Sequence, residues 1–232
     1  MDATLEPGSV AVILPAAGTS RRFGGPQSKI FATLAGHPVW WHAANRLRSF
    51  SEVGQIVIAI HPDDRPRWES EFADAVASLR IDLVDGGGER YESVLRAIER
   101  IEGASFIAVH DAARPLVSHT DLQRLFDAAT TRDAVMLATP VRGTIKRSDD
   151  ESIVQTTVDR SRLWEAQTPQ MFRRELLIDA YARWRGWPVT DDASLVERAG
   201  GKVFLVEGSP MNLKITGPDD LLLAEAILQA SR

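Results

Sequence analysis

Small residues and cations occur close together near the N-terminus, in the segment PAAGTSRRFGGPQSK. Its small residues are Ala16, Ala17 and Gly18, and its cations are Arg21, Arg22 and Lys29. Small side chains let backbone N–H groups approach an anion closely, and the cations would balance several negative charges. The spacing matches neither the G-x-G-x-x-G dinucleotide motif nor the P-loop motif. The segment therefore predicts a triphosphate site, and the alternative is a surface loop with solvated basic residues.

A carboxylate, Asp111, forms the second candidate group, in the segment HDAARP that directly follows an apolar run. A carboxylate near a buried strand is costly unless a cation or a metal ion pairs with it. Because Mg²⁺ needs only one or two protein carboxylates besides phosphates and water, Asp111 is a candidate magnesium ligand. An ion pair with Arg114, or a cap on the following turn, explains Asp111 equally well. We expect the neighbouring His110 to belong to the strand and to be structural.

Composition and charge exclude several classes of function. The absence of cysteine rules out disulfides, thiolate metal sites and cysteine nucleophiles, and fits a reducing compartment. A formal net charge of −5 argues against general nucleic-acid binding. No apolar run approaches the ~20 residues that span a bilayer, and the N-terminus lacks the pattern of a secretion signal. We therefore expect a cytoplasmic protein with neither nucleic acid nor membrane as a partner.

The candidate groups follow short apolar runs that are typical of buried strands, at residues 10–14, 55–60, 81–84, 106–109 and 134–138. The segments between these runs show helical spacing. This alternation predicts an α/β fold with a doubly wound, mostly parallel sheet. In such sheets ligands bind beyond the carboxyl ends of the strands, so the loops should converge on one edge. The length of 232 residues favours a single domain spanning residues 1–232.

The pattern changes after residue 141, where TIKRS, SDDE and SIVQTTVD predict two extended segments joined by a tight polar turn. We interpret residues from about 142 to 165 as a β-arm that protrudes from the domain. Beyond the arm we expect a helix from about Arg173, a helix beginning at TDDAS, a strand near residues 203–206 and a final helix from Pro218.

Several motifs, taken in order, resemble one enzyme family over nearly the whole chain. They are PAAGTSRRF with Lys29, DGGGERYESV, VHDAARP, PVRGTIKR, TVDRSRLWEAQTPQMF, TDDAS and NLKITGPDDLLLAEAIL. The chain resembles the 2-C-methyl-D-erythritol 4-phosphate cytidylyltransferases of the non-mevalonate isoprenoid pathway. The resemblance implies a Rossmann-like fold of the nucleotide-diphospho-sugar transferase type. It also implies transfer from CTP to 2-C-methyl-D-erythritol 4-phosphate, yielding 4-diphosphocytidyl-2-C-methyl-D-erythritol and pyrophosphate, with Mg²⁺ or another divalent cation.

The same resemblance implies a role for each residue that matches the family motifs. The catalytic cations are Arg22 and Lys29, which would stabilise the transition state at the α-phosphate of the nucleotide. The nucleotide-binding residues are Ala16, Ala17, Gly18, Gly87 and Ser93. The acceptor-binding residues are Asp111, Thr144, Arg160, Thr190 and Lys214, with Asp111 also beside the metal. The resemblance further implies a homodimer in which the β-arm of one subunit contributes to the acceptor site of its neighbour.

Two positions depart from the family pattern. The family commonly has Pro-Lys-Gln around the first-loop lysine, where this chain has Gln27-Ser28-Lys29-Ile30, and an acidic residue often follows the glycine pair, where this chain has Gly88. Three alternatives remain: a cytidylyltransferase of the same fold that acts on ribitol 5-phosphate, a sugar-1-phosphate nucleotidyltransferase using UTP or GTP, and a catalytically silent nucleotide-binding protein.

Overall fold

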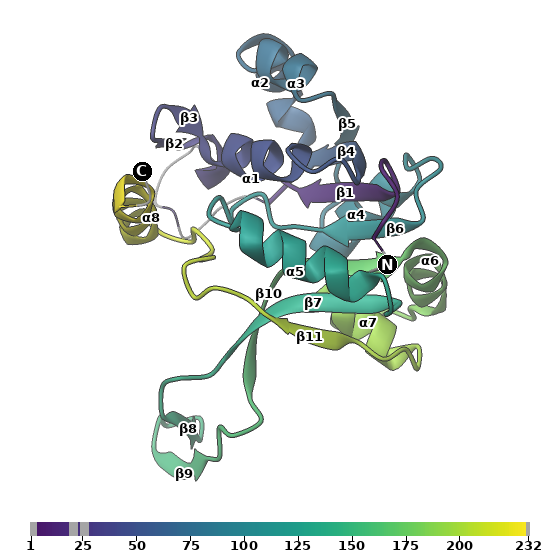
Figure 1. The fold of residues 1–232 in the computed structure, drawn as a ribbon. Coiled ribbons are helices and arrows are strands. Elements are labelled where there is room, and N and C mark those ends of the chain that lie inside the picture. The colour runs from purple at the N-terminus through teal and green to yellow at the C-terminus, as the bar shows by residue number, and fades with distance from the viewer. Residues whose placement is uncertain (1–3, 19–22, 24–27, 231–232) are drawn as a thin grey trace.

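Helices cover both faces of a central sheet (Figure 1). The structure is a computed structural model that describes residues 4–18, 23 and 28–230, and within these residues the sheet has seven strands in the order β11-β7-β10-β6-β1-β4-β5. Its strands are β1 (Val10–Pro15), β4 (Val53–Ile60), β5 (Ile81–Asp85), β6 (Phe106–Val109), β7 (Ala134–Pro140), β10 (Trp164–Arg173) and β11 (Phe204–Glu207). Arg22 lies outside the described residues.

The sheet is mostly parallel, as the sequence predicts. Strand β1 pairs in parallel with β4 and β6, β4 pairs in parallel with β5, and β11 pairs in parallel with β7. The five predicted apolar strands and the predicted strand near 203–206 are all present. The exception is β10, which lies antiparallel between β6 and β7 and which the sequence pattern does not predict.

Eight α-helices connect or flank the strands within the described residues. They are α1 (Val39–Arg48), α2 (Arg65–Ser70), α3 (Ala73–Ser78), α4 (Arg90–Ile98), α5 (His119–Ala129), α6 (Arg174–Arg183), α7 (Asp192–Arg198) and α8 (Pro218–Ala230), with 3-10 turns η2 (Lys29–Phe31) and η3 (Pro62–Asp64). The helices expected near Arg173, at TDDAS and from Pro218 are α6, α7 and α8. None of the helices in the described residues is long and apolar enough to cross a membrane.

Strand β1 contributes to two cores because its side chains alternate between the faces of the sheet. Val12 and Leu14 pack into the core that includes residues of α1, α2 and α5, whereas Ala11 and Ile13 pack into the core that includes residues of α4, α6 and α7. All five residues of 10–14 are completely buried. This two-sided burial explains why the strand is a continuous apolar run rather than an alternating one.

The predicted β-arm projects away from the sheet (Figure 1). It contains β8 (Ile145–Ser148) and β9 (Val154–Val158), which pair in antiparallel register with Ile145 opposite Val158. The polar turn is closed by Asp149 Oδ1, which accepts hydrogen bonds from the backbone N–H groups of Glu151 and Ile153 at 3.1 and 2.9 Å. An aspartate commonly closes a turn in this way, which explains why the segment SDDE predicts a turn.

A third, smaller core joins the C-terminal helix to the first part of the chain. The short strands β2 (Thr33–Leu34) and β3 (His37–Pro38) form a hairpin next to α1. Leu34 and Val39 pack in one cluster with Ile215 and with Ala224 of α8. The segment that precedes α8 is thereby held near the carboxyl ends of the central strands.

Candidate active site

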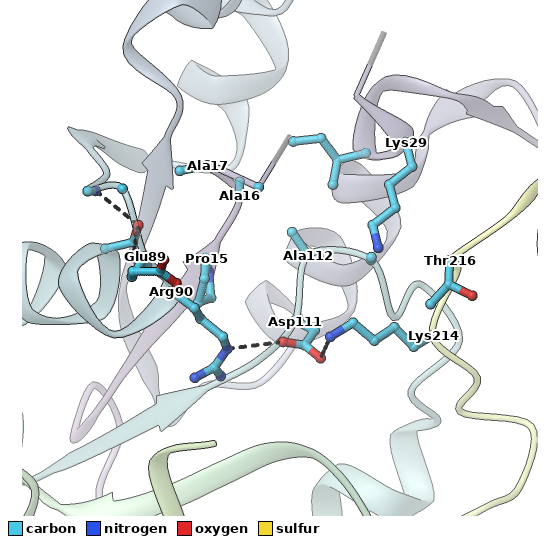
Figure 2. Close-up of a pocket in the computed structure, with 16 residues that line it drawn as sticks. Pro15, Ala16, Ala17, Lys29, Glu89, Arg90, Asp111, Ala112, Lys214 and Thr216 are labelled. Atoms are coloured by element: carbon cyan, nitrogen blue, oxygen red, sulfur yellow. Dashed lines mark hydrogen bonds and ion pairs between the residues drawn. The ribbon is translucent and has the colours of Figure 1, made fainter. Parts of the chain in front are cut away.

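A pocket of about 360 Å³ opens at the carboxyl ends of β1, β5 and β6, where the sequence predicts that the loops converge. It is lined by Pro15, Ala16, Ala17, Gly18, Lys29, Ile30, Gly87, Gly88, Glu89, Arg90, Ser93, Asp111, Ala112, Ala113, Lys214 and Thr216. Figure 2 shows that Lys29, Arg90 and Lys214 approach this space from three different segments. Three cations and several small residues therefore line the same pocket.

Two loops form the small-residue side of the pocket by close backbone contact. Ala16 N–H donates to Ala59 O and Gly86 N–H donates to Ile60 O, each at 2.7 Å, so both loops are fastened to the end of β4. A Cβ atom on Gly86 would lie 2.5 Å from Ala17 Cβ and 2.7 Å from Ser93 Oγ. Only glycine permits this approach. The five predicted nucleotide-binding residues all line the pocket.

The N-terminus of α4 keeps the glycine-rich loop in place. Ser93 Oγ accepts a hydrogen bond of 3.0 Å from Gly87 N–H and donates one of 3.2 Å to Glu89 O. Glu89 and Glu92 form a reciprocal capping box, in which each carboxylate accepts from the backbone N–H of the other residue. The caps satisfy helix donors that would otherwise lack partners.

Asp111 lies at the centre of a group of cations. Its Oδ2 is 2.9 Å from Lys214 Nζ and 3.6 Å from Arg114 Nε, and its Oδ1 is 3.7 Å from Arg90 Nε (Figure 2). Burial alone would raise the pKa of Asp111, but Lys214 and Arg90 outweigh it and hold the pKa well below its usual range. The carboxylate is therefore ionised, and the structural pairing with Arg114 considered above is present.

Lys214 reaches the pocket because its segment is fastened to the loop of Asp111. Ile215 N–H donates to Ala113 O at 2.8 Å, and Arg114 Nη1 donates to Asn212 O at 2.6 Å. These bonds fix the backbone on both sides of Lys214. The side chain itself keeps 40% of its surface exposed, so its ammonium group remains available to a ligand in the pocket.

His110 has the structural role that we expect from its position. The side chain is completely buried, and its two ring nitrogens face Arg114 O at 3.1 Å and Thr168 Oγ1 at 3.0 Å. Burial lowers the pKa of His110 to about 4, so the ring is neutral near neutral pH. It does not line the pocket, which argues against a role as a general base.

Arg90 is a pocket residue that sequence reasoning did not single out. Its Nη2 lies 2.7 Å from Asp192 Oδ2, in addition to its contact with Asp111. Burial would lower the pKa of Arg90, but Asp192 and Asp111 outweigh it and raise the pKa. Its position in the sequence could have indicated a role in the pocket, because Arg90 is the first residue of a helix that follows the carboxyl end of a predicted strand.

Three predicted acceptor-binding residues do not line this pocket. Thr144 and Arg160 are exposed on the β-arm, and Thr190 is exposed directly before the N-cap of α7. The structure thus brings Asp111 and Lys214 together with Lys29, and leaves the other three apart from them. The catalytic role of Arg22 concerns a residue outside the described part of the chain and stays a prediction.

The pocket offers a poor set of ligands for a resident metal ion. Within residues 4–18, 23 and 28–230, no group of three or more His, Asp or Glu side chains could hold one. Both carboxylate oxygens of Asp111 already face cations. An ion that arrives with a nucleotide is a different case, because phosphates and water supply most of its ligands. The role of Asp111 beside such an ion stays a prediction.

A family model described as 2-C-methyl-D-erythritol 4-phosphate cytidylyltransferase matches residues 10–230. The chain belongs to this family. The cytidylyltransferase of Rhodopirellula baltica is 45% identical over 236 residues, covering 97% of this chain and 96% of the relative. That of Bacillus velezensis is 41% identical over 222 residues, covering 94% and 95%. Family membership makes the chain a nucleotidyltransferase of the non-mevalonate isoprenoid pathway.

Solved structures of cytidylyltransferases share the fold. The 2-C-methyl-D-erythritol 4-phosphate cytidylyltransferase of Thermus thermophilus is similar with a TM-score of 0.78 and 33% identity, covering 95% of this chain and 99% of that one. The 4-diphosphocytidyl-2C-methyl-D-erythritol synthase of Anaerococcus prevotii is similar with a TM-score of 0.82 and 27% identity, covering 95% and 98%. The predicted fold class is thereby confirmed.

Proposed function

We propose that this cytidylyltransferase joins CTP to 2-C-methyl-D-erythritol 4-phosphate and releases pyrophosphate, and that it works in the cytoplasm. The observation that carries the proposal is the grouping of Lys29, Arg90 and Lys214 around a pocket whose other wall is a glycine-rich loop. Such a pocket suits two polyanions that must approach each other. The absence of cysteine in the chain is the supporting observation for a reducing compartment.

The proposed reaction is an in-line displacement at phosphorus. An oxygen of the acceptor phosphate forms a bond to the α-phosphorus of CTP, while the bond from that phosphorus to the bridging oxygen breaks and pyrophosphate leaves with its electrons. A phosphate monoester has a second pKa of about 6 and is largely dianionic at neutral pH, so its oxygen needs no general base. This chemistry agrees with a pocket in which the adjacent histidine, His110, is buried and neutral.

The main work of the protein is to hold the two anions and to balance charge in the transition state. We assign this charge balance to Lys29, and to Arg22 by resemblance. On the acceptor side, Lys214 would bind the acceptor phosphate and Asp111 would accept a hydrogen bond from an acceptor hydroxyl. The ion pair between these two side chains supports the assignment, because it holds the ammonium group at the pocket.

We infer that magnesium enters as part of the nucleotide substrate rather than as a resident ion. The phosphates of CTP would supply its ligands together with water, and the ion would neutralise charge on the triphosphate. The charged side chains that line the pocket are three cations and the two carboxylates of Asp111 and Glu89, and the three cations suit a polyanionic ligand. Chelation of magnesium in the activity assay should then abolish turnover.

The exposed β-arm supports a homodimer. Thr144 and Arg160 lie on the arm and outside the pocket of their own subunit, so they would contribute to acceptor binding only in the pocket of a neighbour. The arm also exposes apolar side chains, with Ile153 59% and Val154 56% accessible. Contact with a second copy of the chain would remove these side chains from water.

The deciding experiment measures pyrophosphate release from the purified protein with MgCl₂, CTP and 2-C-methyl-D-erythritol 4-phosphate. Parallel reactions replace the acceptor by ribitol 5-phosphate, or CTP by UTP, ATP or GTP. Release confined to CTP and the methylerythritol phosphate is the expected result. Release with ribitol 5-phosphate instead would support the proposed mechanism but identify a different acceptor. Binding of CTP without pyrophosphate release from any substrate pair would indicate a catalytically silent binding protein.

A further inference from the structure

Three helices meet at one buried carboxylate behind the pocket. The side chain of Asp192, the first residue of α7, is 0% exposed. Its Oδ2 lies 2.7 Å from Arg90 Nη2 of α4, and its Oδ1 accepts a hydrogen bond of 2.6 Å from the hydroxyl of Tyr181 in α6. Arg90 continues the chain of contacts to Asp111 in the pocket at 3.7 Å (Figure 2).

The charges of this group depend on one another. A completely buried carboxylate is stable only with partners, and Asp192 has a cation on one oxygen and a hydroxyl on the other. Burial and the charge of Asp192 raise the pKa of Tyr181 well above its ordinary value, so the hydroxyl keeps the proton that it donates. Arg90 is shared between two carboxylates, and its contact with Asp192 at 2.7 Å is shorter than its contact with Asp111 at 3.7 Å. The position of Arg90 therefore depends on Asp192.

Asp192 also lies directly after the loop between α6 and α7, which carries Thr190. Asp191 caps α7 by accepting from Ser194 N–H at 3.0 Å, and it accepts a second hydrogen bond of 2.8 Å from Gln170 Nε2 in β10. Gln170 Oε1 accepts from Ala193 N–H at 2.9 Å. The loop is thus attached to the sheet on one side and to Arg90 on the other.

We infer that Arg90, Asp192 and Tyr181 form a positioning network that sets the place of Thr190 relative to Asp111. Asp111 and Thr190 are two of the five acceptor-binding residues that the family resemblance implies, and the inference rests on the proposed function in this respect. The network residues act through Asp111 and Thr190 rather than on the reacting phosphorus. Their removal should weaken binding of the acceptor.

The nucleotide side of the pocket is held by separate contacts. Gly87 N–H is bonded to Ser93 Oγ at 3.0 Å, and Gly86 N–H is bonded to Ile60 O at 2.7 Å. Neither bond involves a network residue. Damage to the network should therefore change the KM for the acceptor and leave the KM for CTP near its original value.

The test compares Tyr181→Phe and Asp192→Asn with the wild-type chain. Tyr91→Phe is the matched control, because it removes the hydroxyl of the second of the two tyrosines, which contacts Glu92 at 3.3 Å. We expect the acceptor KM to rise about threefold in Tyr181→Phe and about tenfold in Asp192→Asn, the latter equal to about 1.4 kcal/mol. The KM for CTP should stay unchanged in both, and the control should match the wild type.

A merely structural role predicts a different result: lower stability in urea and a lower kcat, with both KM values unchanged. That outcome would overturn the inference. If Asp192→Asn does not fold, Tyr181→Phe decides, because it keeps the aromatic ring and every charge.

Hydrogen exchange at the amides of Ala193 and Ser194 gives a second readout that does not depend on turnover. Faster exchange in Tyr181→Phe than in Tyr91→Phe supports the network, and equal exchange in both variants contradicts it. If the wild-type protein releases no pyrophosphate but Tyr181→Phe still shows faster exchange, the network is supported and the proposed function is contradicted. The two failures are therefore distinguishable.

Discussion

Lys214 Nζ lies 2.9 Å from Asp111 Oδ2, although the two residues come from opposite halves of the chain. The ion pair places a cation with 40% of its side chain exposed beside a carboxylate that is only 12% exposed. Two arginines also face this carboxylate, so Asp111 is held from three sides and keeps the lysine at the pocket. The pair thus provides a cation that an acceptor phosphate can reach.

Replacing this lysine, as Lys214→Ala, should weaken binding of the acceptor. We expect its KM to rise by about tenfold or more, equal to at least about 1.4 kcal/mol, with little change in the KM for CTP. Steady-state kinetics with each substrate varied in turn provides the measurement. The exposed Lys202→Ala is a control of equal charge change and should behave as wild type. An unchanged acceptor KM in Lys214→Ala would contradict a role of Lys214 in binding the acceptor.

Lys29→Ala should fold normally and turn over slowly. Loss of one well-placed cation from a charge-balancing site removes about 3 kcal/mol of transition-state stabilisation, or on the order of a hundredfold in kcat. Single-turnover kinetics at saturating substrates measures this loss directly, and a urea titration checks the fold. A turnover near that of the Lys202→Ala control would contradict the role assigned to Lys29.

Gly86→Ala should damage the nucleotide side of the pocket. The added Cβ would meet Ala17 Cβ at 2.5 Å and Ser93 Oγ at 2.7 Å, so the two loops must separate. Gly88→Ala is the matched control, since its Cβ would find only Glu92 Oε2 at 3.5 Å, an ordinary contact. We expect calorimetry with Mg²⁺ and CTP to show weaker binding in Gly86→Ala and near-normal binding in Gly88→Ala. Equal affinities would show that close packing of these loops is unimportant.

His110 should make the fold sensitive to acid. Its pKa is about 4 in the folded chain and about 6.5 when unfolded, so the unfolded state takes up the proton at the higher pH. The stabilisation is therefore complete above about pH 6.5 and is lost progressively as the pH falls toward 4, by up to about 3 kcal/mol. Urea unfolding of wild type and His110→Gln at pH 7.5 and 5 tests this, and the variant should lose less stability. Equal losses would assign the acid sensitivity to other groups.

The β-arm should hold two copies of the chain together. Val154→Asp puts a charge on an arm position that is 56% exposed, and we expect it to shift the protein from dimer to monomer in light scattering. Ile178→Asp is the control, at a position of α6 that is 37% exposed. A wild-type protein that is monomeric at micromolar concentration would contradict the dimer itself.

Strand β10 could not be predicted from the sequence pattern. Its buried positions include Gln167, Thr168 and Gln170, which break the apolar run by which the other central strands are recognised. These polar side chains are acceptable inside the protein because each has a hydrogen-bond partner in a distant segment, as in the bond from Gln167 Nε2 to Ser209 O at 3.0 Å. No local pattern reveals such partners, so the strand could not be predicted.

Local sequence patterns predict the parallel strands, the β-arm, and the loops that carry Ala16, Gly87 and Asp111, because apolar runs and turn residues act on the nearby backbone. The pairing of Lys214 with Asp111, and the bridge that Arg90 forms between Asp111 and Asp192, are set by the folded arrangement. These contacts depend on how segments far apart in the chain are ordered around the sheet. Burial then makes each pairing obligatory, since a charge removed from water needs a partner wherever the fold supplies one.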